Sequence, residues 1–176
     1  MTGYQAIYDV AADNFGLVTS REAKALGVSD KALNALARRG RLERRGYGVY
    51  RLVHHIPTPM DRYAEALALV GEGAVVCGES VLAINDLALV EPSVVSVRAA
   101  RRCRRTLPGW VRLEPAPFTG ERAFYEGIPC QPVADAIRAV RGRVLPERLA
   151  DAVRTAFERG LLSRREAAAL RKEVKE

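Results

Sequence analysis

The chain has 176 residues, of which 48% are hydrophobic, and it carries a formal net charge of +7. This hydrophobic content is enough for a packed core and excludes an intrinsically disordered chain. No run of 18 or more apolar residues occurs, and the first 16 residues lack the basic start of a secretory signal. We therefore expect a globular, cytoplasmic protein with no membrane-spanning helix.

The charge is distributed unevenly along the chain. Residues 1–56 hold 9 basic and 5 acidic residues, residues 57–131 hold 8 and 9, and residues 132–176 hold 11 and 7. Two basic ends around a neutral middle favour a polyanionic partner, such as nucleic acid.

The cysteines and histidines do not form a metal-binding pattern. Cys77, Cys103 and Cys130 lie far apart, and the only histidines are the adjacent His54 and His55. A structural zinc site needs four ligands at characteristic spacings. We expect three reduced, mostly buried thiols, and neither a metal nor another cofactor.

Three helices are expected in the first 40 residues. Apolar side chains recur at helical spacing over residues 4–15. Thr19 and Glu22 have the spacing of a capping box, which starts a second helix, and Gly27 can end it in the left-handed conformation. Ser29 is then a suitable N-cap for a third helix that reaches Arg39-Gly40.

The third helix is amphipathic and is followed by a predicted hairpin. Leu33, Leu36 and Ala37 fall at i, i+3 and i+4 and form one apolar stripe. Two short strands, 42–45 and 48–51, then flank a glycine-framed reversal. Helix, turn, helix and hairpin in this order are typical of a winged helix-turn-helix.

The outward side of the third helix suits the major groove of DNA. Asparagine can pair with adenine, and arginine or lysine can contact guanine or phosphate. The alternative is that these exposed cations merely solvate the surface. Further contacts are expected from the second helix and from the hairpin, which is the wing of such a domain. The predicted DNA-binding residues are Arg21, Lys24, Ser29, Lys31, Asn34, Arg38, Arg39, Arg44, Arg45 and Tyr47.

Two prolines within residues 57–59 predict a linker, which places a winged helix-turn-helix domain at 1–55 and a second domain at 60–176. The predicted fold class is α+β: the winged domain, then a mixed α/β domain with a small sheet and C-terminal helices. The predicted helices of the second part are 59–70, 79–87, 133–141, 146–159 and 164–175, and its predicted strands are 74–77, 94–98, 110–114 and a strand or hairpin arm within 124–130.

Five arginines lie in eight residues between two of the predicted strands. This loop either contacts phosphates without sequence preference or is a solvated loop tip, and the sequence does not favour one over the other. The arginines are Arg98, Arg101, Arg102, Arg104 and Arg105.

The motifs of common enzymes are incomplete. Gly78-Glu79-Ser80 lacks the second glycine of a nucleophile turn. Glu114 is followed by Pro115-Ala116 and not by the lysine of a nuclease site, and no phosphate-binding glycine loop occurs. We do not expect catalysis.

The N-terminal segments resemble the winged-helix domain of AbiEi-type antitoxins, the transcriptional regulators of bacterial type IV toxin–antitoxin systems. The resemblance rests on residues 16–23, 26–29, 36–44 and 46–50 in that order, and more loosely on 78–84 and 127–135. It implies a repressor that binds inverted repeats of double-stranded DNA in its own promoter. It also implies an antitoxin that opposes a nucleotidyltransferase-like toxin without a stable complex.

Two other hypotheses remain open at the level of sequence. The chain could be a non-catalytic protein-interaction module whose C-terminal helices dock a partner. It could also be a decayed nuclease, or a nuclease-associated subunit, that contacts DNA mainly through residues 98–105. Steep salt dependence of DNA binding separates the first of these from a DNA-binding regulator.

Overall fold

The computed structural model describes residues 3–175 and confirms the predicted α+β class. The chain forms two compact units. One runs up to Glu72 and includes Cys103–Leu107, and the other comprises Gly73–Arg102 and the chain from Pro108 onward. The proline-rich segment predicts a boundary at residues 55–60, but helix α4 (Asp61–Val70) belongs by its contacts to the first unit. Its buried Glu65 forms ion pairs with arginines of the hairpin, which explains this difference.

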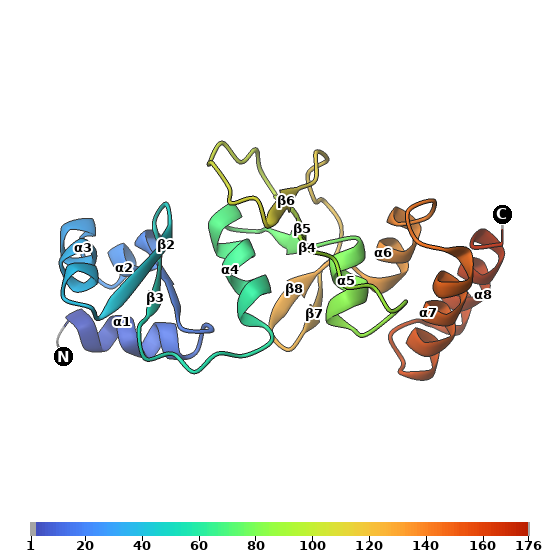
Figure 1. The fold of residues 1–176 in the computed structure, drawn as a ribbon, viewed down its shortest axis with the longest axis horizontal. Coiled ribbons are helices and arrows are strands. Elements are labelled where there is room, and N and C mark those ends of the chain that lie inside the picture. Colours follow the sequence, from blue (N-terminus) through green and yellow to red (C-terminus); the bar gives the residue numbers. More distant parts are fainter. Residues whose placement is uncertain (1–2, 176) are drawn as a thin grey trace. The chain divides into compact units, whose positions relative to one another are not determined.

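The first unit has the element order of a winged helix-turn-helix (Figure 1). Its three strands form an antiparallel sheet in the order β1-β3-β2. Strand β1 is not predicted from the sequence, because three residues are too few to show an alternating pattern. The elements before α4 are α1 (Gly3–Ala12), β1 (Leu17–Thr19), α2 (Ser20–Ala25), α3 (Asp30–Arg38), β2 (Leu42–Gly46) and β3 (Val49–Leu52).

Helix α1 is shorter than predicted. It ends at Ala12, and the chain then reverses through Phe15 and Gly16, both with positive φ. The left-handed conformation at Phe15 breaks the helical spacing that the sequence suggests up to residue 15. The reversal places β1 alongside β3, where Val18 pairs with Tyr50.

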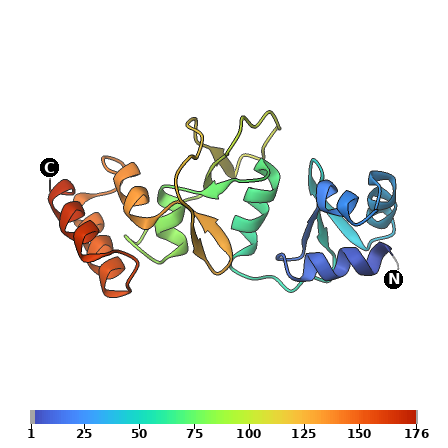
Figure 2. The same cartoon turned by 180° about the vertical axis from the view of Figure 1, so that it is seen from behind.

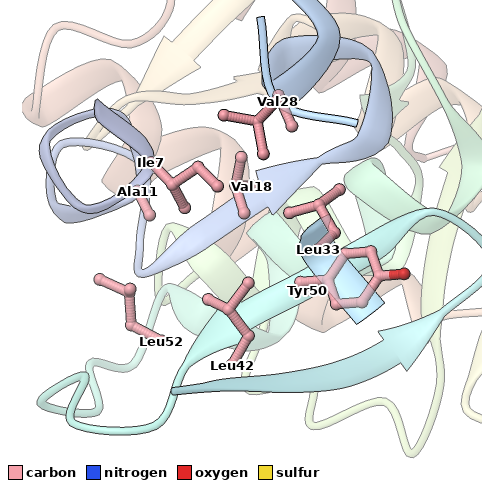
Figure 3. Close-up of a cluster of buried hydrophobic side chains, with 9 residues drawn as sticks. Ile7, Ala11, Val18, Val28, Leu33, Leu42, Tyr50 and Leu52 are labelled. Atoms are coloured by element: carbon pink, nitrogen blue, oxygen red, sulfur yellow. The ribbon is translucent and has the colours of Figure 1, made fainter. Parts of the chain in front are cut away.

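One hydrophobic cluster holds this unit together, and Figure 3 shows how its side chains converge. Leu33 contributes the inner face of α3 and is completely buried. Leu36 and Ala37 are only partly buried and pack against the same cluster. The other labelled members come from α1, the α2–α3 turn and the sheet: Ile7, Ala11, Val18, Val28, Leu42, Tyr50 and Leu52.

The predicted helix boundaries around the turn are confirmed in atomic detail. Thr19 Oγ1 accepts from the Glu22 amide at 3.2 Å, while the Thr19 amide donates to Glu22 Oε2 at 2.7 Å. Gly27 has a φ of +76°, and Ser29 Oγ accepts from the Ala32 amide at 3.2 Å. These contacts provide acceptors for backbone N–H groups that have no partner within the first turn of each helix, and they fix the α2–α3 turn.

The second unit contains a five-stranded mixed sheet in the order β6-β5-β4-β8-β7 (Figures 1 and 2). β4 pairs antiparallel with β5 and parallel with β8, while β5 pairs parallel with β6. The predicted segment 124–130 forms an antiparallel hairpin of two strands. The elements are β4 (Val75–Val76), α5 (Glu79–Ile84), β5 (Val95–Arg98), β6 (Val111–Leu113), β7 (Ala123–Tyr125), β8 (Ile128–Cys130), α6 (Val133–Ala139), α7 (Pro146–Glu158) and α8 (Arg164–Glu173).

The three cysteines are free thiols, as predicted, but only Cys77 and Cys130 are buried. Burial raises the pKa of both thiols to about 12. Because the thiolate is the reactive form, iodoacetamide at pH 8 should alkylate the half-buried Cys103 and spare the other two. Peptide mass spectrometry measures the alkylation of each cysteine. Fast alkylation of Cys77 in the native protein would contradict its burial at the end of β4.

Candidate nucleic-acid interface

Helix α3 presents a polar row to solvent. Lys31, Asn34 and Arg38 lie at i, i+3 and i+7, and all three are exposed, as are Ser29 and Arg39. The opposite side of the helix is fixed by the buried Leu33. The face predicted to meet a base edge is therefore not covered by the rest of the first unit.

The amide of Asn34 is held by the sheet behind it. Tyr50 Oη donates to Asn34 Oδ1 at 3.0 Å, and the Tyr50 ring is 3% exposed. This bond assigns the amide orientation and leaves the Nδ2 hydrogens as donors. A bidentate pairing with adenine would require Oδ1 to accept from Tyr50 and from the base at once, which its two lone pairs allow.

Replacing Tyr50 with phenylalanine tests this tether. The change removes one hydrogen bond from a side chain whose ring stays packed, so we expect a loss of about 0.5–1.5 kcal/mol of stability. If the tether positions Asn34 for base contact, preference for a DNA site selected from a random pool should fall, while the salt dependence stays unchanged. Competition binding with selected and random duplexes measures both, and an unchanged preference would show that the tether only stabilises the fold.

The two predicted contacts of α2 already have carboxylate partners. Lys24 Nζ lies 2.9 Å from Asp30 Oδ2, and Arg21 forms an ion pair with Glu72. The hydrogen bond to Asp30 raises the pKa of Lys24, and the bonds from Lys24 and Ser20 lower the pKa of Asp30. All four charged side chains are at least half exposed, so a phosphate could replace either carboxylate at small cost.

All three predicted contacts of the wing are exposed, but one of them forms ion pairs. Arg44 is exposed, and Tyr47 at the tip is 73% exposed. Arg45 instead contacts Glu43 at 2.8 Å and Glu65 of α4 at 3.0 Å. The bond to Glu65 raises the pKa of Arg45. Arg45 therefore joins the wing to α4 in this structure and is the least available of the three for phosphate contact.

Glu65 is the centre of this junction, and sequence reasoning missed it. Its side chain is 6% exposed and also binds Arg51 of β3, with Nη1 and Oε2 2.9 Å apart. Next to it, a Cβ on Gly46 would lie 2.3 Å from Leu69 Cδ2, so the hairpin and α4 approach closely only because residue 46 is glycine. The sequence signal for this site is a lone acid in the apolar part of α4, Ala64-Glu65-Ala66-Leu67.

The arginine-rich segment does not form one patch. Arg105 donates to the Leu69 carbonyl at 3.1 Å, at the end of α4, and its guanidinium lies 5.7 Å from the Tyr47 ring centroid. Arg98 is half-buried beside Cys77, and its Nε has no hydrogen-bond partner among the described residues. Arg101, Arg102, Arg104 and Arg105 are all exposed, and among the described residues the first three form no hydrogen bond with α4. A phosphate-contacting role therefore stays a prediction for these three, while Arg105 anchors the segment.

Comparison with known proteins agrees with the N-terminal part of the resemblance seen in the sequence. Residues 5–53 match the model of a family described as "Transcriptional regulator, AbiEi antitoxin". No curated protein matches the chain. The family match spans the helix-turn-helix and its wing, so every predicted contact from Arg21 to Tyr47 falls inside it. Separately, no helix among residues 3–175 is long and apolar enough to cross a membrane.

Proposed function

We propose that this protein is a sequence-specific DNA-binding transcriptional regulator, with α3 in the major groove and the β2–β3 wing on the sugar–phosphate backbone. The observation that carries the proposal is the exposed row of Lys31, Asn34 and Arg38 on a helix whose other face packs against the hydrophobic cluster. The match of residues 5–53 to a family of transcriptional regulators supports it. The protein acts by binding and not by catalysis.

We further propose that it represses its own operon and serves as the antitoxin of a type IV toxin–antitoxin system in the bacterial cytoplasm. The description of the matching family supports regulation and the antitoxin role. Its operator is an inverted repeat, and its functional partner is a nucleotidyltransferase-like toxin that it opposes without a stable complex.

A reporter fused to the DNA upstream of the protein's own gene tests the regulatory proposal. Co-expression of the full chain should lower reporter output, and co-expression of the K31Q/R38Q variant should not. Equal output with both proteins, at equal protein levels, would rule out autoregulation through α3.

Replacing Arg44 with glutamine tests the wing separately. Because Arg44 is placed on phosphates and not on bases, selected and random duplexes should lose affinity alike, and the slope of log K against log salt should fall by about 0.9. Gel-shift titrations over a range of salt concentrations measure this slope. A loss confined to the selected duplex would mean that Arg44 contacts a base.

A further inference from the structure

We propose that helix α8 is a second nucleic-acid contact, in which a row of cations binds DNA phosphates without sequence preference. The proposal rests on the proposed function, since it adds an affinity surface in the second unit to the DNA-reading surface of the first. Helices α7 and α8 pack side by side at the C-terminal end of this unit (Figures 1 and 2).

The charges of α8 are separated by face. Its inner side is buried through Ala167, Leu170 and Val174. At 100° per residue, the four cations of the helix fall within an arc of about 120° on the outer side. These exposed cations are Arg164, Arg165, Arg171 and Lys172, and the exposed Lys175 follows just beyond the helix.

The two acids of α8 are directed away from this row. Glu166 closes a capping box by accepting from the Ser163 amide at 2.8 Å. Glu173 binds Arg138 of α6, with Oε2 and Nε 3.0 Å apart. Among residues 3–175, none of the five cations forms an ion pair. The row is therefore an unneutralised positive surface and not one half of a salt-bridge network.

Helix electrostatics does not account for all of these cations. Arg171 and Lys172 lie in the last turn, where the helix dipole favours positive charge. Arg164 and Arg165 occupy the first two positions, where the dipole disfavours it. The neighbouring helix α7 shows the contrast, because its Arg154 is paired with Asp151 and Glu158.

The chemistry of this face favours phosphate over a protein partner. Protein interfaces depend on buried apolar or aromatic anchors at their centre, whereas the only apolar side chain on the exposed arc is Ala168. A small residue at this position lets the sugar–phosphate backbone of DNA approach the helix closely. The cations from Arg164 to Lys172 span about 12 Å of helix, which corresponds to three or four phosphates of one DNA strand.

The test uses the full chain, the variant R164Q/R165Q/K172Q/K175Q and duplexes over a range of salt concentrations. Arg171 is kept because its guanidinium lies over the Phe157 ring, 5.7 Å from the centroid. Glutamine is a good helix former, so the fold should survive, and far-UV circular dichroism verifies this. A second variant, R164K/R165K, keeps the charge.

We expect the quadruple variant to lower the salt slope by about 3 and to weaken binding to selected and random duplexes by the same factor. The lysine variant should retain the wild-type slope. The control R112Q/R154Q, which removes cations of β6 and α7, should also retain it.

An unchanged slope in the quadruple variant would overturn the α8 proposal, and so would a loss of affinity confined to the selected duplex. If K31Q/R38Q still loses selected DNA in that case, the proposed function stands without α8. If neither variant changes DNA binding, both proposals fail together.

Discussion

The K31Q/R38Q variant is expected to lose about 2–6 kcal/mol of binding free energy on a DNA duplex selected from a random pool, since each good base contact is worth about 1–3 kcal/mol. Lys31 and Arg38 are the two cations of the exposed row on α3, and neither has an ion-pair partner among the described residues. Random duplexes should lose much less, because there the two side chains only add phosphate attraction. Fluorescence anisotropy with both duplexes measures the two losses.

The matched control for this prediction is R112Q/R154Q, which removes two positive charges from the second unit. It should leave the preference for the selected duplex unchanged. Equal losses on selected and random DNA for K31Q/R38Q would assign both residues to the phosphate backbone and would remove the base-reading role from α3.

Replacing Glu65 with alanine is expected to destabilise the first unit by about 2–4 kcal/mol, because it leaves two arginines facing a site that has lost its charge. Arg51 has a side chain that is only 15% exposed and cannot easily reach water. Arg45 is 32% exposed and can turn outward, which limits the cost. Chemical denaturation followed by far-UV circular dichroism gives the loss of unfolding free energy.

Glu43 offers a control on the same arginine. Its side chain is 58% exposed and contacts Arg45 at 2.8 Å. Its replacement with alanine should cost no more than about 1 kcal/mol. If both variants lost the same small amount, the contact between α4 and the hairpin would not be a stabilising junction, and Arg45 would be available to DNA.

The local elements of the first unit could be predicted from the sequence because short-range chemistry determines them. The capping box at Thr19, the left-handed Gly27 and the cap at Ser29 each act over three or four residues, and all are present in the structure. The amphipathic pattern of α3 likewise predicts which face is buried. The order of these elements then indicates a winged helix-turn-helix, which the structure and the family match support.

The long-range partners could not be predicted, because they depend on tertiary contacts that no local pattern encodes. Arg45 looks equivalent to Arg44 in the sequence, and both are exposed, yet only Arg45 binds Glu65, which lies 20 residues further along the chain. In the same way, Arg105 belongs to a uniform run of arginines but packs against α4 and Tyr47. Charge alone therefore overestimates how many of these cations can meet phosphate.

The domain boundary also depends on tertiary contacts that the local sequence does not encode. The two prolines of residues 57–59 do interrupt regular structure, as predicted. Beyond them, however, the chain is tied to the first unit, where His55 Nε2 lies 2.8 Å from Asp61 Oδ2. Burial opposes ionisation of Asp61, but hydrogen bonds from Thr58 and His55 outweigh it and lower its pKa. A proline-rich segment thus predicts where a helix or strand cannot continue, but it does not predict which unit the next helix joins.

Mapping the DNA-contacting surface by amide chemical-shift changes is the most direct test of this account. On titration with a selected duplex, the largest changes should fall on residues 29–39, which are α3 with its two caps, and on residues 43–48 of the wing. Changes confined to the second unit, with α3 and the wing unaffected, would contradict DNA recognition by the winged helix.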